Sequence, residues 1–104
     1  LNDIDTKDVK AIMTTGLYGD CHDHDLIADL GIPIINDSCQ AFLSKYKGKE
    51  ATSIGDASAI SFAQNKTCPV FGTYGAVLTD RDDWADDFSY TRRIFGTCAE
   101  MAGS

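Results

Sequence analysis

Three polar residues stand where apolar runs of the sequence end, and their types suit one kind of chemistry. Asp37 follows the run Ile32–Asn36, Ser61 lies near the end of Ala57–Phe62, and Lys66 comes in the loop that follows. Ligands of open α/β sheets bind beyond the carboxyl ends of the strands, so these positions are candidates for a site. Pyridoxal 5′-phosphate (PLP) needs such a set: an amine to bond to its aldehyde, a carboxylate to keep its ring nitrogen protonated, and a hydroxyl for its phosphate.

Each residue also has an ordinary structural interpretation. Asp37 can cap the turn D-S-C-Q, Ser61 can be a small strand residue, and Lys66 can be a solvated lysine. A second cluster of polar residues consists of Asp20, His22, Asp23, His24 and Asp25. It could hold Zn or Mn, because imidazoles and carboxylates are ligands for these metals. The alternative for this cluster is a solvated turn that enters a helix.

The apolar pattern predicts four strands that would position these residues, at Lys10–Leu17, Ile32–Asn36, Ala57–Phe62 and Gly75–Thr79. The first should be buried, and a helix between the first two would make a right-handed βαβ unit with parallel strands. No helical periodicity separates the last two strands, which favours antiparallel pairing between them. We therefore predict an α/β fold with a mixed, mostly parallel sheet of about four strands and flanking helices.

Two helices and one mixed segment complete the prediction. Asp23–Leu30 should be a helix with Leu26, Ile27 and Leu30 on one face and Gly31 after it. Phe42–Glu50 should be a short helix followed by an exposed turn. A last helix is expected from about Arg81 to Phe95, capped by Asp80 and ended by Gly96, with one face formed by Trp84, Phe88, Thr91 and Phe95.

Composition limits the classes of protein. The 104 residues are 43% hydrophobic and 24% charged, which predicts a single α/β domain over residues 1–104 and excludes collagen, coiled coil and a wholly disordered chain. A net charge of −7 argues against nucleic acid as a partner. The apolar runs are too short to span a membrane and no signal peptide heads the chain, so we expect a soluble, cytoplasmic protein. The spacing of Cys21, Cys39, Cys68 and Cys98 is typical of reduced thiols.

Several segments together resemble one family. They are, in order, L-Y-G-D-C-H-D-H-D-L-I (Leu17–Ile27), I-N-D-S-C-Q-A (Ile35–Ala41), Y-K-G-K (Tyr46–Lys49), I-G-D (Ile54–Asp56), I-S-F-A-Q-N-K (Ile60–Lys66) and G-A-V-L-T-D (Gly75–Asp80). In order and spacing they are similar to the DegT/DnrJ/EryC1/StrS family of sugar aminotransferases, from about Val9 to Gly96. The resemblance implies part of the large domain of the aspartate-aminotransferase fold, PLP as cofactor, and transfer of an amino group from a donor such as glutamate to a nucleotide-linked keto sugar.

The resemblance also implies residue roles. Lys66 matches the lysine that binds PLP covalently and moves the proton at the reacting carbon, and Asp37 matches the partner of the ring nitrogen. Gln40 matches the residue near the phenolic oxygen, and Ser61 matches a phosphate ligand. A branch of the family with His at the position of Lys66 catalyses dehydration, so Lys66 favours the aminotransferase branch.

The sequence departs from the family at Thr15-Gly16, where many members have Val-His, and at Tyr74-Gly75, where a pair of glycines is common. Family members are several times longer, and their subunits complete each other's sites as homodimers. We therefore expect a segment that is not catalytically complete alone. The alternative is a non-catalytic truncated α/β module that folds and associates without cofactor.

Overall fold

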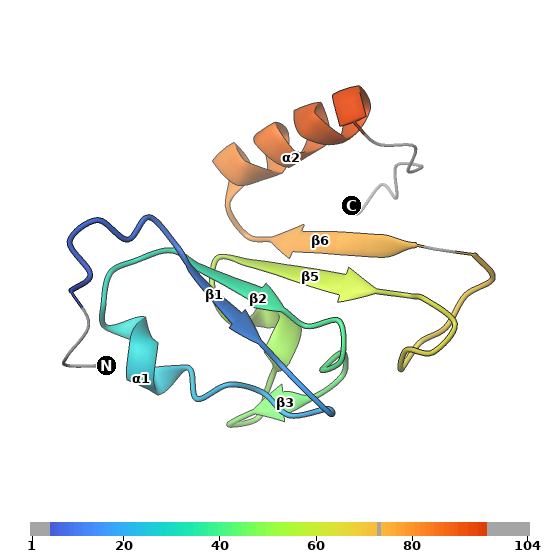
Figure 1. Cartoon of the computed structure of the whole chain (residues 1–104), viewed down its shortest axis with the longest axis horizontal. Coiled ribbons are helices and arrows are strands. Elements are labelled where there is room, and N and C mark those ends of the chain that lie inside the picture. The colour runs from blue at the N-terminus through green and yellow to red at the C-terminus, as the bar shows by residue number, and fades with distance from the viewer. Residues whose placement is uncertain (1–4, 73, 96–104) are drawn as a thin grey trace.

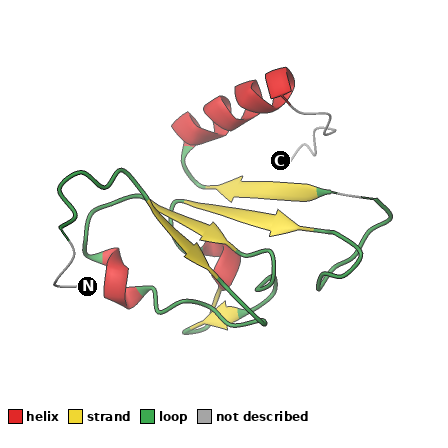
Figure 2. Ribbon diagram, viewed as in Figure 1, coloured by secondary structure: helices red, strands yellow, loops and turns green. Residues whose placement is uncertain are grey.

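Four short strands form the sheet of this protein. The computed structural model describes residues 5–72 and 74–95, and orders the strands β1 (Ile12–Thr15), β2 (Ile34–Asp37), β5 (Ala57–Ser61) and β6 (Gly75–Thr79) side by side (Figure 1). β1, β2 and β5 are parallel, whereas β6 is antiparallel to β5. The predicted mixed, mostly parallel sheet is confirmed. Between β5 and β6 the described residues form loop only, as Figure 2 shows, so these strands do not need a crossover helix.

One face of the sheet carries the core. Ile34, Asn36, Ser58 and Ile60 are buried, and they share a face because their positions alternate along β2 and β5. The short 3₁₀ helix η1 (Ala51–Ser53) and the residue after it are tied to this face by Asn36. Its amide nitrogen donates to the carbonyl oxygens of Ala51 (3.3 Å) and Ile54 (2.5 Å), and its amide oxygen accepts from the Thr14 hydroxyl of β1.

The first strand differs from the expectation. It covers Ile12–Thr15 instead of Lys10–Leu17, and half-buried residues alternate with exposed ones along it. Met13 is 72% exposed, so the prediction that this strand is buried was wrong. In the described residues β1 is an edge strand that pairs with β2 alone, and Met13 lies on the face of the sheet opposite to the one that η1 contacts. An apolar run therefore did not imply burial on both faces.

The helix after β1 is shorter than expected. α1 is one turn, Asp25–Ala28, instead of Asp23–Leu30, and of its apolar residues only Ile27 is buried while Leu26 is 65% exposed. The Leu30 N–H donates to the Ile27 oxygen (3.2 Å), a bond that tightens the chain after the first turn. Gly31 follows with φ of 66°, as expected of a glycine just after a helix.

The predicted short helix in Phe42–Glu50 was wrong, because β3 (Lys45–Tyr46) and β4 (Lys49–Glu50) form an antiparallel hairpin there. Lys47 and Gly48 both have positive φ, 47° and 83°, as a two-residue turn of type I′ requires. The exposed turn is confirmed. The hairpin contacts α1, because the Tyr46 hydroxyl donates to the Asp23 carboxylate (2.5 Å) and Lys47 pairs with Asp25.

The last helix has the predicted extent to within one residue, but among the described residues Asp80 makes no hydrogen bond that would cap it. α2 spans Asp82–Phe95 and lies beside β6, at the far side of the sheet from β1 (Figure 1). Trp84 is half-buried and packs edge-on against Phe88, with ring centroids 6.0 Å apart, so these two share a face as expected. The side chain of Phe95, the role of Gly96 and the state of Cys98 lie outside what the structure describes. Neither helix of the described part has the length and apolar character needed to cross a membrane.

Candidate active site

Asp37 ends β2 and begins a tight turn at the carboxyl edge of the sheet. Its carboxylate is half-buried, and Oδ1 accepts the Cys39 N–H at 3.1 Å. The Ser38 N–H donates to the Ala59 oxygen of β5 (2.9 Å), which keeps the turn on the sheet. Within the described residues Oδ2 has no hydrogen-bond partner. Oδ1 of Asp37 is thus held by the backbone, while Oδ2 can accept a hydrogen bond from a further donor.

Gln40 connects this turn to the loop after β1. Its side-chain oxygen accepts the Tyr18 N–H (3.4 Å), and its backbone oxygen accepts the Gly19 N–H (2.9 Å). Ser44 holds the same loop by donating its hydroxyl to the Gly19 oxygen (2.5 Å). Because the amide oxygen of Gln40 is occupied, its amide nitrogen is the group that can donate to a ligand.

Ser61 and Lys66 belong to one hydrogen-bonded turn after β5. The Ser61 hydroxyl oxygen accepts the Ala63 N–H (3.4 Å), and the Ala63 oxygen accepts the Lys66 N–H (3.0 Å). Phe62 extends the strand by donating its N–H to the Tyr74 oxygen (2.9 Å). The turn brings Lys66 back over the edge of the sheet, and the hydroxyl hydrogen of Ser61 remains free to donate.

These loops enclose an open pocket of about 480 Å³, lined by Tyr18, Gly19, Cys39, Gln40, Asn65, Lys66 and Thr67. The structure therefore brings Gln40 and Lys66 together. Asp37 and Ser61 do not line the pocket. Asp37 is one hydrogen bond from Cys39 in the wall, and Ser61 is linked to Lys66 through Ala63.

The residues present fit PLP. The pocket volume lies in the usual range for small-molecule sites, roughly 300–1,000 Å³. An amine and an amide donor line it, with a carboxylate next to its wall. Burial and, after it, the hydrogen bond and charge of Asp37 raise the pKa of Cys39, while the charge of Lys66 acts in the opposite direction. Cys39 thus lies near both the Asp37 carboxylate and the Lys66 ammonium group.

Five residues that line the pocket were not among the predicted site residues: Tyr18, Gly19, Cys39, Asn65 and Thr67. Cys39 follows Asp37 with one residue between, and this spacing was a signal that both could serve one site. Tyr18 has a positive φ of 55° and is 95% exposed. A tyrosine in this conformation is uncommon, and its place before Gly19 was the only sign of a tight loop there.

One of the two departures from the family pattern, at Thr15-Gly16, has a steric reason in this fold. A Cβ on Gly16 would lie 2.6 Å from the Cβ of Ala41 and 2.7 Å from the Asp20 oxygen. At Tyr74-Gly75 the glycine agrees with the family pattern, and it too is required by close packing, because a Cβ there would lie 2.9 Å from the Ile60 oxygen. Nothing in the structure explains the tyrosine at position 74.

The cluster from Asp20 to Asp25 is not arranged as a metal site. In the part of the chain that the structure covers, no group of three or more His, Cys, Asp or Glu side chains comes together in a way that could hold an ion. His22 instead lies between the Cys21 sulfur (3.8 Å) and His24 (3.4 Å), and burial, followed by the charge of His24, lowers its pKa. Asp23 and Asp25 contact the hairpin.

Comparison with known proteins identifies the family of this chain. A sequence model of the DegT/DnrJ/EryC1/StrS aminotransferase family matches residues 2–100. The chain is 37% identical over 84 residues to a UDP-2-acetamido-2-deoxy-3-oxo-D-glucuronate aminotransferase of Pseudomonas aeruginosa, covering 77% of this chain and 23% of the relative. It is 34% identical to a GDP-perosamine synthase of Escherichia coli O157:H7, covering 92% of this chain and 32% of that protein.

A solved structure gives the same assignment. DesI, crystallised in the presence of its TDP-sugar product, superposes with a TM-score of 0.77 at 27% identity, covering 93% of this chain and 25% of DesI. The chain spans about a quarter to a third of the length of these proteins. Aminotransferases of this family depend on PLP. The sheet has the aspartate-aminotransferase-like fold, and the chain belongs to the DegT/DnrJ/EryC1/StrS aminotransferase family.

Proposed function

We propose that this chain supplies the PLP-holding part of an aminotransferase that acts on a nucleotide-linked keto sugar with an amino-acid donor such as glutamate. The observation that carries the proposal is the pocket in which Lys66 and Gln40 meet beside Asp37. The names of the relatives, which describe nucleotide-sugar aminotransferases, support the substrate class.

The chain's own residues divide the work. Lys66 would hold the cofactor through its amine and would move a proton at the reacting carbon. Asp37 would keep a proton on the ring nitrogen, and Gln40 would donate its amide N–H to the phenolic oxygen. Ser61 would donate its hydroxyl to the phosphate. When bound, PLP stabilises the negative charge that develops on the substrate carbon during amino-group transfer.

The proposal includes a homodimer in the cytoplasm. β1 and β6 are the edges of the sheet in the described part of the chain, and exposed strand edges favour association. Cys21, Cys39 and Cys68 are free thiols, as expected in a reducing compartment. Further groups of the site would come from parts of the enzyme beyond these residues, including the second subunit.

A titration with PLP tests the proposal. Visible absorbance and fluorescence should show saturable binding by the purified chain, and Lys66→Ala should abolish the change in the cofactor's spectrum. Lys49→Ala is the matched control, because Lys49 lies on exposed β4 and does not line the pocket. If Lys66→Ala bound PLP as the parent chain does, the role of Lys66 would be rejected. Absence of binding to the parent chain would favour the non-catalytic module instead.

A further inference from the structure

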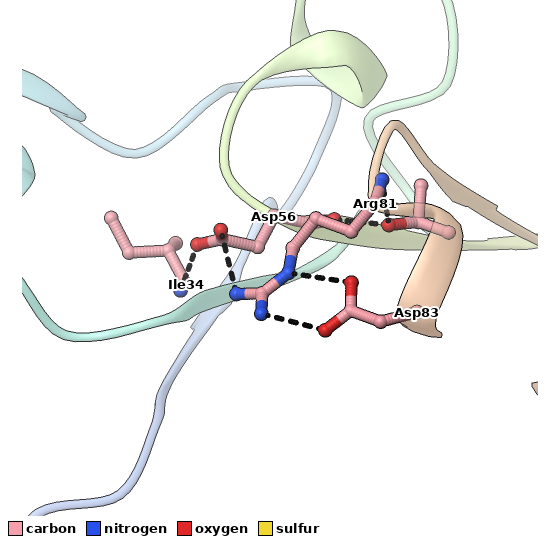
Figure 3. A network of polar contacts seen from close by, with 5 residues as sticks. Ile34, Asp56, Arg81 and Asp83 are labelled. Carbon is pink, nitrogen blue, oxygen red and sulfur yellow. Dashed lines mark hydrogen bonds and ion pairs between the residues drawn. The ribbon is translucent and has the colours of Figure 1, made fainter. Parts of the chain in front are cut away.

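The motif I-G-D (Ile54–Asp56) lies at the end of the sheet opposite to the pocket, and the proposed function leaves it unexplained. Asp56 makes two hydrogen bonds to one residue of β2, Ile34, and Figure 3 shows the bond that its carboxylate accepts. The Asp56 N–H donates to the Ile34 oxygen at 2.8 Å, and Asp56 Oδ2 accepts the Ile34 N–H, also at 2.8 Å. Both backbone groups of Ile34 on this side are therefore satisfied by a single residue.

These two bonds to Ile34 lie where the pairing of β2 with β5 begins. Once Ile34 is fixed beside Asp56, Ile35 pairs with Ala57 and Asp37 pairs with Ala59. A shift of one residue would turn every side chain of β2 to the other face of the sheet. The Asp37 carboxylate would then leave the side of the sheet on which it accepts the Cys39 N–H. The position of the Asp37 carboxylate thus depends on a contact at the far end of the same strand.

Asp56 is itself held in place. Arg81 Nη1 lies 3.5 Å from Asp56 Oδ1, and the guanidinium group is fixed by two hydrogen bonds to Asp83 (3.0 and 3.4 Å), as Figure 3 shows. The ring of Trp84 stacks on the guanidinium at 4.3 Å. The Thr79 hydroxyl donates to the backbone oxygen of Asp56 (2.6 Å). Arg81, just before α2, therefore supports the carboxylate that holds β2, and Thr79 at the end of β6 holds the backbone of the same residue.

Gly55 is the other functional part of the motif. It has a φ of 82°, and a Cβ there would lie 3.0 Å from the Ile34 oxygen. A larger residue would push the two backbones apart at the point where Asp56 must reach both groups of Ile34.

We propose that Asp56 is a positioning residue for the active site, which fixes the register of β2 and thereby places the Asp37 carboxylate against Cys39 in the wall of the pocket. The inference rests on the proposed function for the role of Asp37, but its structural step can be measured without cofactor. Asp56 touches neither the pocket lining nor Asp37, so its effect acts through the strand.

Amide hydrogen exchange of the cofactor-free chain, followed by NMR, tests the structural step. Asp56→Ala should lower the protection of the Ser38 and Cys39 amides about tenfold, while amides of the β5–β6 pair keep theirs within about twofold. Asp56→Asn keeps an oxygen for the Ile34 N–H and should restore most of the protection. Asp82→Asn is the control, because Asp82 is an exposed carboxylate of the same first turn of α2 and makes no hydrogen bond or ion pair with the side chains of Arg81 or Asp56 among the described residues. Equal losses in Asp56→Ala and Asp82→Asn would overturn the inference, as would uniform loss over both strand pairs.

A double-mutant cycle then tests the link to the site. Asp37→Asn and Asp56→Ala should each weaken PLP binding, and the double variant should be little worse than the more damaging single variant, because both act on one carboxylate. Additive effects would show that Asp56 acts only through general stability and would overturn the inference. If the parent chain bound no PLP, the proposed function would fail, and the exchange experiment would still decide whether Asp56 positions the turn after β2.

Discussion

Replacing Asn36 by alanine should destabilise the fold more than most single changes. Asn36 is 2% exposed, and its amide joins β1, β2 and η1 through bonds to Thr14, Ala51 and Ile54. The Ala51 oxygen keeps a second donor, the Ile54 N–H at 3.4 Å, so its loss is partly compensated. The Ile54 oxygen, which accepts at 2.5 Å, loses a bond inside the core. We expect the main cost to arise there.

The size of the effect follows from these contacts. Leaving a buried carbonyl without its partner costs about 1–3 kcal/mol, and the lost bond to Thr14 adds roughly 0.5–1.5 kcal/mol. A decrease of about 2–4 kcal/mol in the free energy of unfolding is expected, which is a large part of the roughly 5–15 kcal/mol typical of a domain. Urea unfolding followed by circular dichroism should show a lower midpoint at an unchanged slope.

Two controls make this test specific. Thr14→Val removes only the hydroxyl donor, so it should cost about 1 kcal/mol. Asn65→Ala makes the same change at an exposed position and should stay within about 0.5 kcal/mol. A loss below about 0.5 kcal/mol in Asn36→Ala would refute the idea that this amide holds η1 on the sheet.

Three further outcomes are expected. Gly16→Ala should lower stability by about 1–3 kcal/mol, because its Cβ would lie 2.6 Å from another side chain, while Thr15→Ala on the exposed side of β1 should change little in urea unfolding. The fold lowers the pKa of His22 below its usual 6.5, so the unfolded chain binds more protons than the folded chain once the pH drops below about 6.5. Stability should therefore fall as the pH decreases through 6.5. The unfolding midpoints of His22→Gln should lose this part of the pH dependence. Iodoacetamide should alkylate exposed Cys68 faster than Cys39, whose pKa burial raises, and bound PLP should slow Cys39 further in peptide mapping.

Each of these outcomes has a result that contradicts it. Parent-like stability of Gly16→Ala would mean that the loop after β1 can move away from the Cβ. An unchanged pH dependence in His22→Gln would place the acid sensitivity elsewhere. Equal alkylation of Cys39 and Cys68, with no protection by PLP, would remove Cys39 from the wall of the cofactor pocket.

The larger elements could be predicted because their patterns are local and strong. The strand Gly75–Thr79 has the predicted bounds, and α2 begins one residue after the expected start. The antiparallel pairing of β5 and β6 followed from the absence of helical periodicity between them. The resemblance selected Lys66 and Gln40, which the structure brings to one pocket.

Other features depend on contacts that no local pattern contains. The β3–β4 hairpin needs a positive φ at Lys47, a residue with no intrinsic preference for it, and its contacts with Asp23 and Asp25 lie far away in the sequence. Those same contacts occupy two of the three carboxylates that suggested a metal site, Asp23 and Asp25. The burial of β1 depends on whether other elements cover both faces of the sheet, and the apolar run alone does not show this. Asp56 contacts Ile34 and Arg81, which lie far from it in the sequence, so no local pattern predicts the proposed role of Asp56.

Reductive trapping tests the central claim most directly. The chain is incubated with PLP, reduced with borohydride, digested and mapped by mass spectrometry, which locates the lysine that carries the cofactor. The proposed site predicts one dominant adduct on Lys66, with the exposed lysines of the hairpin labelled only weakly. Absence of an adduct on Lys66, or equal labelling of all lysines, would contradict the proposal that this pocket holds the cofactor.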